Sequence, residues 1–303
     1  MHANRTNALA TLYVVGTGIL WGLYWVPVRQ LGAMGLQGAW GSLAICGVAA
    51  ILLLPFAWRA RARLCRANRI GLASVALGGF AFALYSVGLV YGRVAIIVIL
   101  FFLSPVWSTL IGRVVMGWPV SRLRIAALSI GMAGLLMVLG ADGGMPRPRG
   151  LGEWLGLLSG LLWSVATTGI RAKSDTGPGE TAFVFAAGAS LGLLILAPML
   201  EPVPGTIDRP GLALIWTLAA GGVWWGLSMA GLMWAAARLE PARVGILLMA
   251  EVLVGTTSAA LFAGEPLGLI ETAGGALVVL AGVMEVWPQR VAYAAGTGSN
   301  PFS

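Results

Sequence analysis

The stretch Gly18-Ile-Leu-Trp21, inside the first long apolar run of the chain, returns as Gly160-Leu-Leu-Trp163 at a distance of 142 residues. In both copies an arginine follows eight residues after the tryptophan, Arg29 in the first copy and Arg171 in the second. A motif that recurs in two apolar runs, with the same polar residue behind it, indicates that the chain contains two related units.

Two further pairs of matching stretches occur in the same order. Residues Gly78–Tyr91 share paired glycines, a Gly-Leu step and a terminal aromatic residue with residues Gly221–Trp234, at an offset of 143. Gly117-Trp118-Pro119 matches Gly264-Glu265-Pro266 at an offset of 147. Three matches at nearly the same offset predict an internal repeat that covers most of the chain.

The composition places both units in a membrane. The chain has 303 residues, of which 58% are apolar and only 10% are charged, and its mean hydropathy is +0.89. A soluble globular domain carries about 25% charged residues, so these values exclude an ordinary soluble enzyme, a coiled coil and a disordered chain. The net charge of +8 comes from arginines in short gaps between apolar runs. That placement is typical of membrane topology signals and not of a nucleic-acid surface.

The lengths of the apolar runs predict the fold class. A spanning helix needs roughly 20 mostly apolar residues, and the polar gaps between the runs are too short to fold as soluble domains. The sequence therefore predicts an all-α integral membrane protein with ten transmembrane helices. We expect them at residues 9–28, 36–57, 70–91, 94–112, 123–140, 152–170, 181–199, 211–235, 243–262 and 270–287.

The basic residues predict an orientation. With a cytoplasmic N-terminus, the 19 basic residues divide 14 to 5 in favour of the cytoplasmic side, as the positive-inside rule requires. An even number of spans then places both termini in the cytoplasm. We expect residues 1–145 to form a first five-helix repeat, residues 146–288 a second, and residues 289–303 a cytoplasmic tail. Because five is odd, the second repeat is inverted, and inverted repeats place a substrate site at their interface near the membrane midplane.

Short motifs add a family resemblance. Besides the Gly-x-x-Trp pair, the chain carries Gly264-Glu265-Pro266-Leu267, Ala83-Leu84-Tyr85-Ser86 and Ser104-Pro105-Val106. With ten spans as five plus five, these motifs resemble the EamA-like branch of the drug/metabolite transporter superfamily, and within it the bacterial amino-acid exporters, including the aromatic amino-acid exporters. The likeness runs from about Leu9 to Trp287. It implies export of small metabolites across the bacterial inner membrane, through a cavity lined by the first, third, fourth, sixth, eighth and ninth spans.

The chain departs from the family pattern at two positions. Trp118 stands where the family often has glutamate, and Val252 follows Glu251 where the family often has proline. The missing proline removes the usual cause of a kink in the ninth span.

Glu251 is the only ionisable residue that the sequence places deep inside a predicted span. An unpaired carboxylate is costly there. It is expected either to bind a substrate ammonium group or a proton, or to make a packing hydrogen bond to a neighbouring helix.

Aromatic and hydroxyl side chains share helix faces with these motifs. Trp21 and Trp25 lie on one face of the first span, and Trp163 and Thr167 lie on the matching face of the sixth. Indoles offer a rigid wall for apolar substrate groups, and ordinary helix packing is the alternative. The other predicted substrate-binding residues are Tyr85, Trp224 and Ser228, with Ser104, Ser108, Thr256 and Ser258 as weaker candidates.

Gly18, Gly160 and Pro105 are predicted hinge or cavity positions. Glycine permits close helix approach, and a proline inside a helix frees a carbonyl and bends the helix. Freed backbone is tolerated in a membrane where it lines a cavity. Small-residue packing and a plain kink are the alternatives.

The sequence favours a secondary transporter that exports amino acids of broad range, including aromatic and apolar ones, by alternating access. Transport of another small metabolite or a drug, an intramembrane lipid-modifying enzyme, and a channel are the alternatives. No enzyme activity is expected, because the sole histidine is His2 and the sole lysine, Lys173, follows alanine and not the glycine of a phosphate-binding loop. We expect no cofactor, no metal and no nucleic-acid partner. The expected partners are amino acids, the lipid bilayer and, in a coupled mechanism, protons, and we expect a monomer.

Overall fold

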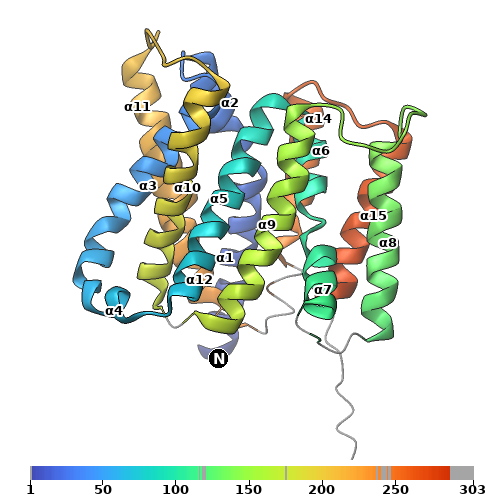
Figure 1. Ribbon diagram of the computed structural model, residues 1–303, viewed down its shortest axis with the longest axis horizontal. Coiled ribbons are helices and arrows are strands. Elements are labelled where there is room, and N and C mark those ends of the chain that lie inside the picture. Colours follow the sequence, from blue (N-terminus) through green and yellow to red (C-terminus); the bar gives the residue numbers. More distant parts are fainter. Residues whose placement is uncertain are drawn as a thin grey trace, which may run out of the picture.

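The computed structural model describes residues 2–115, 117, 121–174, 176–236, 238–239, 244 and 247–286. These residues form helices and connections, with no strand among them, and most helices run along a common axis as a bundle (Figure 1). The elements are α1 (His2–Gly22), α2 (Trp25–Ala33), α3 (Ala39–Arg59), α4 (Arg61–Arg66), α5 (Arg69–Tyr91), α6 (Val94–Phe101), α7 (Ser104–Val114), α8 (Arg122–Leu139), α9 (Leu151–Lys173), α10 (Pro178–Leu200), α11 (Pro210–Ala219), the π-helix η1 (Ala220–Leu227), α12 (Ser228–Ala236), α14 (Ala250–Phe262) and α15 (Leu269–Val286). The predicted tail 289–303 lies outside the described residues.

Eight helical segments are long and apolar enough to cross a membrane, and they coincide with the first eight predicted spans. They are Thr6–Ala33, Ala39–Arg59, Arg69–Tyr91, Val94–Val114, Arg122–Leu139, Leu151–Lys173, Pro178–Leu200 and Pro210–Leu227. In place of the ninth and tenth spans there are shorter apolar helices at Ala250–Phe262 and Leu269–Met284. Part of the expected ninth span, 243–262, falls on residues that the structure does not describe. The count of ten spans therefore stays a prediction.

The first span is interrupted between α1 and α2, at Leu23 and Tyr24. Pro27 lies four residues after Leu23, where it has no N–H for the Leu23 carbonyl and its ring crowds that carbonyl. The backbone tightens accordingly, and the Tyr24 N–H bonds to the Trp21 carbonyl at 3.1 Å, three residues back. The proline thus separates two helices within one membrane crossing.

The fourth span is interrupted in a similar way. α6 ends at Phe101 and α7 begins at Ser104, directly before Pro105. α14 likewise begins directly after a turn at Met249, although Val252 and not proline follows Glu251 there. Phe102 and Met249 are 147 residues apart, which is the offset of the Gly-x-Pro motifs.

Close helix contacts at matching glycines recur at the offsets of the sequence repeat, 142 and 147 residues. A β-carbon built at Gly18 would lie 3.6 Å from the Leu247 carbonyl oxygen, and one at Gly160 would lie 3.1 Å from the Leu100 carbonyl oxygen. Gly117 and Gly264 both have a left-handed backbone, with φ of +68° and +66°, a conformation that favours glycine. The recurring sequence motifs therefore occupy matching local environments.

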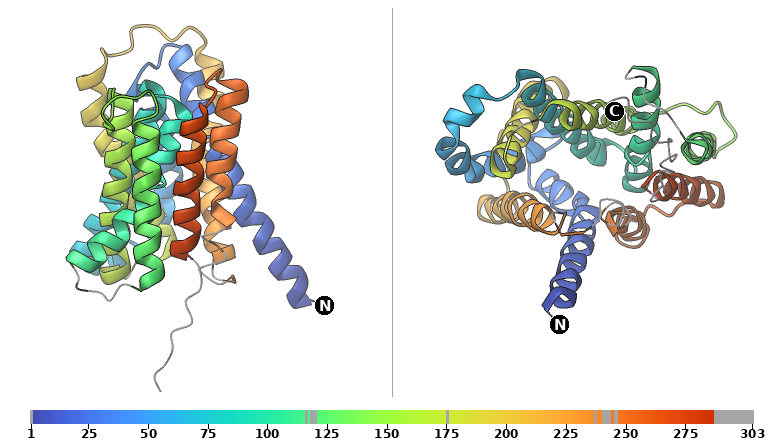
Figure 2. Two further views of the ribbon diagram at one scale, coloured as in Figure 1. Left: turned by 90° about the vertical axis from the view of Figure 1, so that its right-hand side faces the viewer. Right: turned by 90° about the horizontal axis from the view of Figure 1, so that it is seen from below.

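Each first span packs against the other half of the chain. α1 packs against α12 and α14, whereas α9 packs along α5, α6 and α7. In both views of Figure 2, the N-terminal part of α1 projects away from the bundle. α5 and the α6–α7 segment are the most buried of the candidate spans. They form the centre of the bundle, while outer helices such as α10 expose apolar residues, among them Leu191, Leu194 and Ile195.

One element differs from the sequence expectation. The sequence predicts a plain polar connection between the second and third spans, but its residues Arg61–Arg66 form the short helix α4. Asn68 then starts α5, because its side chain accepts hydrogen bonds from the backbone N–H groups of Ile70 and Gly71.

Candidate functional site

A cluster of aromatic rings fills the centre of the bundle. Trp21 of α1 lies edge-on to Phe82 of α5 with ring centroids 5.0 Å apart, and Phe82 lies edge-on to Trp225 of η1 at 4.9 Å. Such edge-to-face pairs are favourable beyond the area that they bury. The rings come from six different elements, so the cluster holds both halves of the chain together. Its members are Trp21, Tyr24, Phe82, Tyr85, Phe101, Phe102, Trp163, Phe185 and Trp225.

The structure brings two predicted site residues, Trp21 and Ser228, into direct contact. The Trp21 indole Nε1 donates to the Ser228 hydroxyl oxygen at 3.2 Å. The Ser228 hydroxyl in turn donates to the Trp224 carbonyl oxygen, one turn back. Ser228 therefore orients Trp21 and is itself held by the helix backbone.

Trp224 and Trp25 fix the interrupted first span to the second half of the chain. The Trp224 indole donates to the Leu20 carbonyl oxygen at 2.6 Å, just before the break between α1 and α2. The Trp25 indole donates to the Ser258 hydroxyl on α14 at 3.0 Å. Both indoles therefore bond to protein groups at the break and do not point freely into a cavity.

Tyr85 and Trp163 lie on the other side of the cluster. The Tyr85 ring is buried 4.7 Å from the Phe101 ring, and Trp163 lies 5.9 Å from the same ring. Thr167 is on the same helix as Trp163, but its hydroxyl donates to the Trp163 carbonyl oxygen at 2.8 Å. The Thr167 hydroxyl is therefore bonded within its own helix, as the alternative of ordinary helix packing predicts.

Glu251 begins the first turn of α14, next to the close approach of α1. A β-carbon at Gly22 would lie 2.8 Å from the Glu251 carbonyl oxygen, and one at Gly18 would lie 3.3 Å from the Glu251 amide nitrogen. Within the described part of the chain, no side chain or backbone group forms a hydrogen bond or ion pair with the Glu251 carboxyl. It is close enough to the Tyr85 hydroxyl to interact with it electrostatically. A partly exposed carboxyl without a partner, beside the aromatic cluster, is suited to a cationic or protonated ligand.

Two of the three predicted hinge residues, Gly160 and Pro105, lie at the break in the fourth span, whereas Gly18 of α1 faces the start of α14. Gly160 faces the break, and a β-carbon there would lie 2.9 Å from the Phe101 carbonyl oxygen. The Phe101 carbonyl is the one that Pro105, four residues later, leaves without its helical N–H. The Ser164 hydroxyl on α9 donates to the carbonyl oxygen of Ser104, the first residue of α7, at 2.7 Å. Glycine and serine of α9 therefore cover the irregular backbone of the fourth span.

Several cluster members were not among the predicted site residues. Tyr24 follows Trp21 by three residues and Phe82 precedes Tyr85 by three, so both share a helix face with a predicted residue. That spacing is a signal that sequence reasoning could have used. Phe185 carries no such signal, because its place depends on the packing of α10 against α5.

One end of the bundle is closed by polar contacts. Arg29 at the end of the first span binds Glu265 at 2.7 Å, and it also donates to the carbonyl oxygens of Leu89 and Gly92 at 3.1 and 3.0 Å. The other Glu265 oxygen accepts the backbone N–H of Val94 at 2.6 Å. These contacts tie the first span and the start of α6 to the loop after α14.

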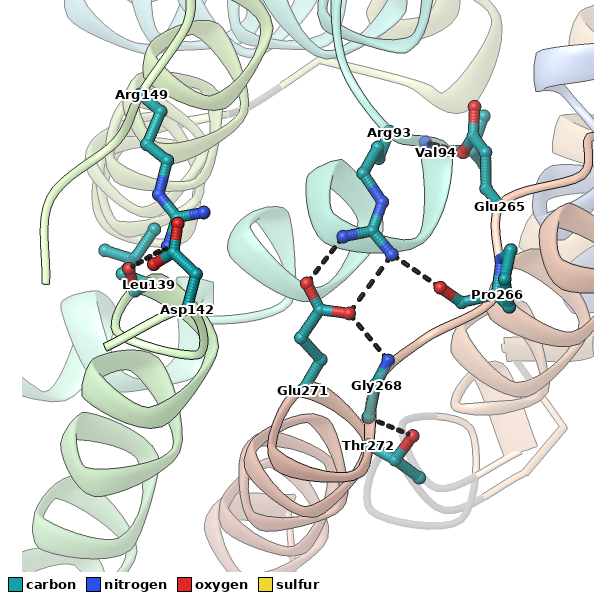
Figure 3. Close-up of polar contacts among 10 residues, drawn as sticks. All are labelled: Arg93, Val94, Leu139, Asp142, Arg149, Glu265, Pro266, Gly268, Glu271 and Thr272. Atoms are coloured by element: carbon teal, nitrogen blue, oxygen red, sulfur yellow. Dashed lines mark hydrogen bonds and ion pairs between the residues drawn. The ribbon is translucent and has the colours of Figure 1, made fainter. Parts of the chain in front are cut away.

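Arg93 adds a second pair at the same loop. It holds the Glu271 carboxylate with two nitrogens, at 2.5 and 3.1 Å, and donates to the Pro266 carbonyl oxygen at 2.7 Å. Figure 3 shows Arg93 lying between Glu271 and Pro266, with Glu265 and Val94 nearby and the separate pair Arg149–Asp142 to one side. We call Arg29, Arg93, Glu265 and Glu271 the polar closure.

Among the described residues, no group of three or more His, Cys, Asp or Glu side chains is placed to hold a metal ion. The two cysteines, buried Cys46 and exposed Cys65, are both free.

Comparisons with known proteins find similarity to one sequence family and to solved structures. Residues 8–140, just under half of the chain, match the sequence model of the EamA-like transporter family, and the match ends close to the expected repeat boundary at 145. A solved structure described only as "Crystal structure of protein" is similar with a TM-score of 0.55 and 19% sequence identity, over 91% of this chain and 95% of that chain. At this identity the likeness shows a common fold. No curated protein matches the sequence.

Proposed function

We propose that this chain is a transporter of the EamA-like family, in the drug/metabolite transporter superfamily, and that it exports amino acids by alternating access. The family match over residues 8–140 supports the transporter class. The substrate class rests on one observation, the unpaired Glu251 carboxyl beside the aromatic cluster. A free carboxylate next to aromatic rings suits a substrate that carries both an ammonium group and an apolar or aromatic side chain.

Each group in the site has a proposed task. Glu251 binds the substrate ammonium group, and the rings of Trp21, Tyr85 and Trp163 contact its side chain. Ser228 holds the Trp21 ring in position through the hydrogen bond at 3.2 Å. The same carboxyl is the proposed place for a proton when no substrate is bound, which would couple export to a pH gradient.

The polar closure supplies the proposed gate. Arg29 is bound to the C-terminal end of α5 and to Glu265 in the loop after α14, and we propose that these contacts hold this end of the bundle shut. Alternating access requires these contacts to break while contacts at the other end form. The matching glycine contacts at Gly18 and Gly160 support two related units that exchange conformations.

The proposed topology has ten helices as a 5+5 inverted repeat, with both termini in the cytoplasm and the protein in the bacterial inner membrane. Reporter fusions at the N-terminus and at the connection 141–150 test it. We expect the N-terminal fusion on the cytoplasmic side and the 141–150 fusion on the opposite side. The same side for both would overturn the inverted repeat.

Uptake into proteoliposomes tests the function itself. With the purified chain, a panel of aromatic, aliphatic and charged amino acids should show saturable uptake and counterflow for the aromatic and apolar members. Repeating the assay with and without a pH gradient measures coupling. Flux that rises linearly with concentration would indicate a channel. Saturable transport of drugs without any amino acid would assign the alternative substrate class.

A further inference from the structure

Helix α4 carries a dense basic surface that the proposed transport mechanism does not use. Five arginines occur within eleven residues around it, and the side chains of all five are exposed. They are Arg59, Arg61, Arg63, Arg66 and Arg69. α4 lies at the same end of the bundle as the N-terminus, at the outer edge (Figure 1).

The neighbouring part of α3 places this surface at the edge of the bilayer. Phe56 and Trp58 at the end of α3 are 54% and 66% exposed, as expected for side chains that face lipid. The guanidinium of Arg61 lies over the Trp58 ring, 5.2 Å from its centroid. Tryptophan beside arginine at the end of an apolar helix is typical of the membrane–water interface, so α4 begins at headgroup level.

A pocket of about 200 Å³ opens between α4 and the start of α10. It is several times larger than the roughly 30 Å³ that one water molecule occupies in the liquid. Its lining residues are Arg63, Arg66, Ala67, Thr176 and Glu180. The wall beside it is fixed, because α5 approaches the end of α9 so closely that a β-carbon at Gly71 would lie 2.6 Å from the Lys173 carbonyl oxygen.

The charges in this pocket favour an anion. Glu180, which is only 5% exposed, forms an ion pair with one Arg63 nitrogen at 2.7 Å, while 76% of the Arg63 side chain remains exposed. Arg66 forms no ion pair or hydrogen bond with another described residue. Two guanidinium groups against one carboxylate leave an excess positive charge, and arginine forks match phosphate oxygens well.

We infer that the pocket formed by Arg63, Arg66 and Thr176 binds the phosphate group of an anionic phospholipid. The exposed apolar end of α3 beside the pocket supplies the contact for the acyl chains, which a free phosphate ion would not use. The surrounding arginines attract an anionic leaflet through the same charge complementarity. The bound lipid would link the second and third spans to the start of α10.

Thermal unfolding of the full-length purified protein in detergent tests this site. The midpoint is measured while phosphatidylglycerol, phosphatidylcholine or inorganic phosphate is added. We expect phosphatidylglycerol to raise the midpoint in a saturable way, and the other two to have little effect. Arg66→Gln should raise the phosphatidylglycerol concentration needed for the half-maximal effect about fivefold. One arginine near an anionic surface contributes about that factor to binding.

Two further variants separate the pocket from general charge. Arg63→Gln combined with Glu180→Gln removes a pocket cation together with its partner, keeps the net charge and leaves no buried carboxylate unpaired. It should also weaken the phosphatidylglycerol effect. Arg122→Gln removes one exposed arginine at the start of α8 and should leave the effect unchanged. An equal loss in Arg122→Gln, an equal midpoint shift with phosphatidylcholine, or full stabilisation by inorganic phosphate alone would overturn the proposal.

Discussion

At the scale of single residues, the Glu251 carboxyl is the most informative group in the bundle, because it lies inside a predicted span and no described residue binds it. The Trp21, Trp224 and Trp25 indoles nearby all donate to protein acceptors. None of these three indoles therefore donates to the Glu251 carboxyl. A ligand or water must satisfy the carboxyl whenever it is ionised.

Glu251→Gln tests whether the Glu251 carboxyl binds the substrate ammonium group and the coupling proton. The amide keeps the shape but removes the charge, so uptake of zwitterionic substrates into proteoliposomes should fall at least about tenfold, a change of about 1.4 kcal/mol. Any dependence of uptake on a pH gradient should also disappear.

Glu153→Gln is the matched control, because this carboxyl lies in the first turn of α9 and accepts the Arg149 backbone N–H away from the aromatic cluster. Wild-type uptake and pH dependence in Glu251→Gln would remove this residue from both binding and coupling.

Sequence reasoning could select candidate residues because helix periodicity shows which residues share a face. It put Trp21 and Ser228 on candidate faces, and the structure joins them in one hydrogen bond. It did not foresee that Trp25 would meet Ser258 or that Phe82 would stand between Trp21 and Trp225. Those contacts depend on the distance and rotation between helices, which periodicity within one helix does not contain.

At the scale of elements, close helix contact at glycine decides how α5 and α10 pack. A β-carbon at Gly79 would clash with the Phe185 carbonyl oxygen and would lie 2.7 Å from the Ala189 amide nitrogen. Both neighbours are backbone atoms and cannot turn away. The two helices would have to separate to admit any side chain.

Gly79→Ala is therefore expected to destabilise the protein by about 1–3 kcal/mol, the usual cost of overpacking. A lower midpoint of thermal unfolding in detergent measures it. Gly16→Ala in α1 is the control, because a β-carbon there has no neighbour within 4 Å; its midpoint should not fall. Equal midpoints for the two variants would contradict the close packing.

The break before Pro105 is expected to matter for motion more than for stability. Pro105→Ala restores the N–H that the Phe101 carbonyl lacks and favours one continuous helix through α6 and α7. The maximal exchange rate in counterflow should drop severalfold, while the substrate concentration at half-maximal rate changes little.

Pro198→Ala supplies the comparison, since this proline lies inside α10, is exposed and borders no ring of the cluster. If both variants exchange substrate at the wild-type rate, the break is a packing feature and not a hinge.

Hydropathy located eight spans because burial in lipid requires long apolar segments whatever their exact backbone path. It gave no information on the π-helix η1 or on the start of α14 after Met249. Pro105 does predict an interruption, because proline lacks its N–H. Pro27 has the same effect in the first span, whereas Pro55 and Pro198 lie inside helices that continue past them. The turn at Met249, by contrast, comes without a proline and follows from packing against α1.

At the scale of the whole molecule, the polar closure joins elements from both halves of the chain at one end of the bundle. The pairs Arg29–Glu265 and Arg93–Glu271 are partly shielded from water. Removing one member of a shielded pair costs more than the pair itself contributes. The closure is thus sensitive to single substitutions.

Glu265→Gln should open this end. In a background without Cys65, a cysteine placed at the buried position Leu89 should react several times faster with a membrane-impermeant thiol reagent in Glu265→Gln than in the parent. Asp142→Asn is the control, because Asp142 pairs with Arg149 inside a single connection. Equal reactivity in all three proteins would show that the closure does not govern access.

The crossed packing of the first spans has a consequence for how the chain is made. α1 is synthesised first, but its partners α12 and α14 are synthesised only near the end of translation. α9, from the second half, packs against α5, α6 and α7 of the first half. A gene cut within the 141–150 connection would thus encode two fragments. Each fragment would expose the glycine-containing helix face that packs against the other half in the intact chain. Neither fragment should accumulate when expressed alone, and both should be recovered together when co-expressed.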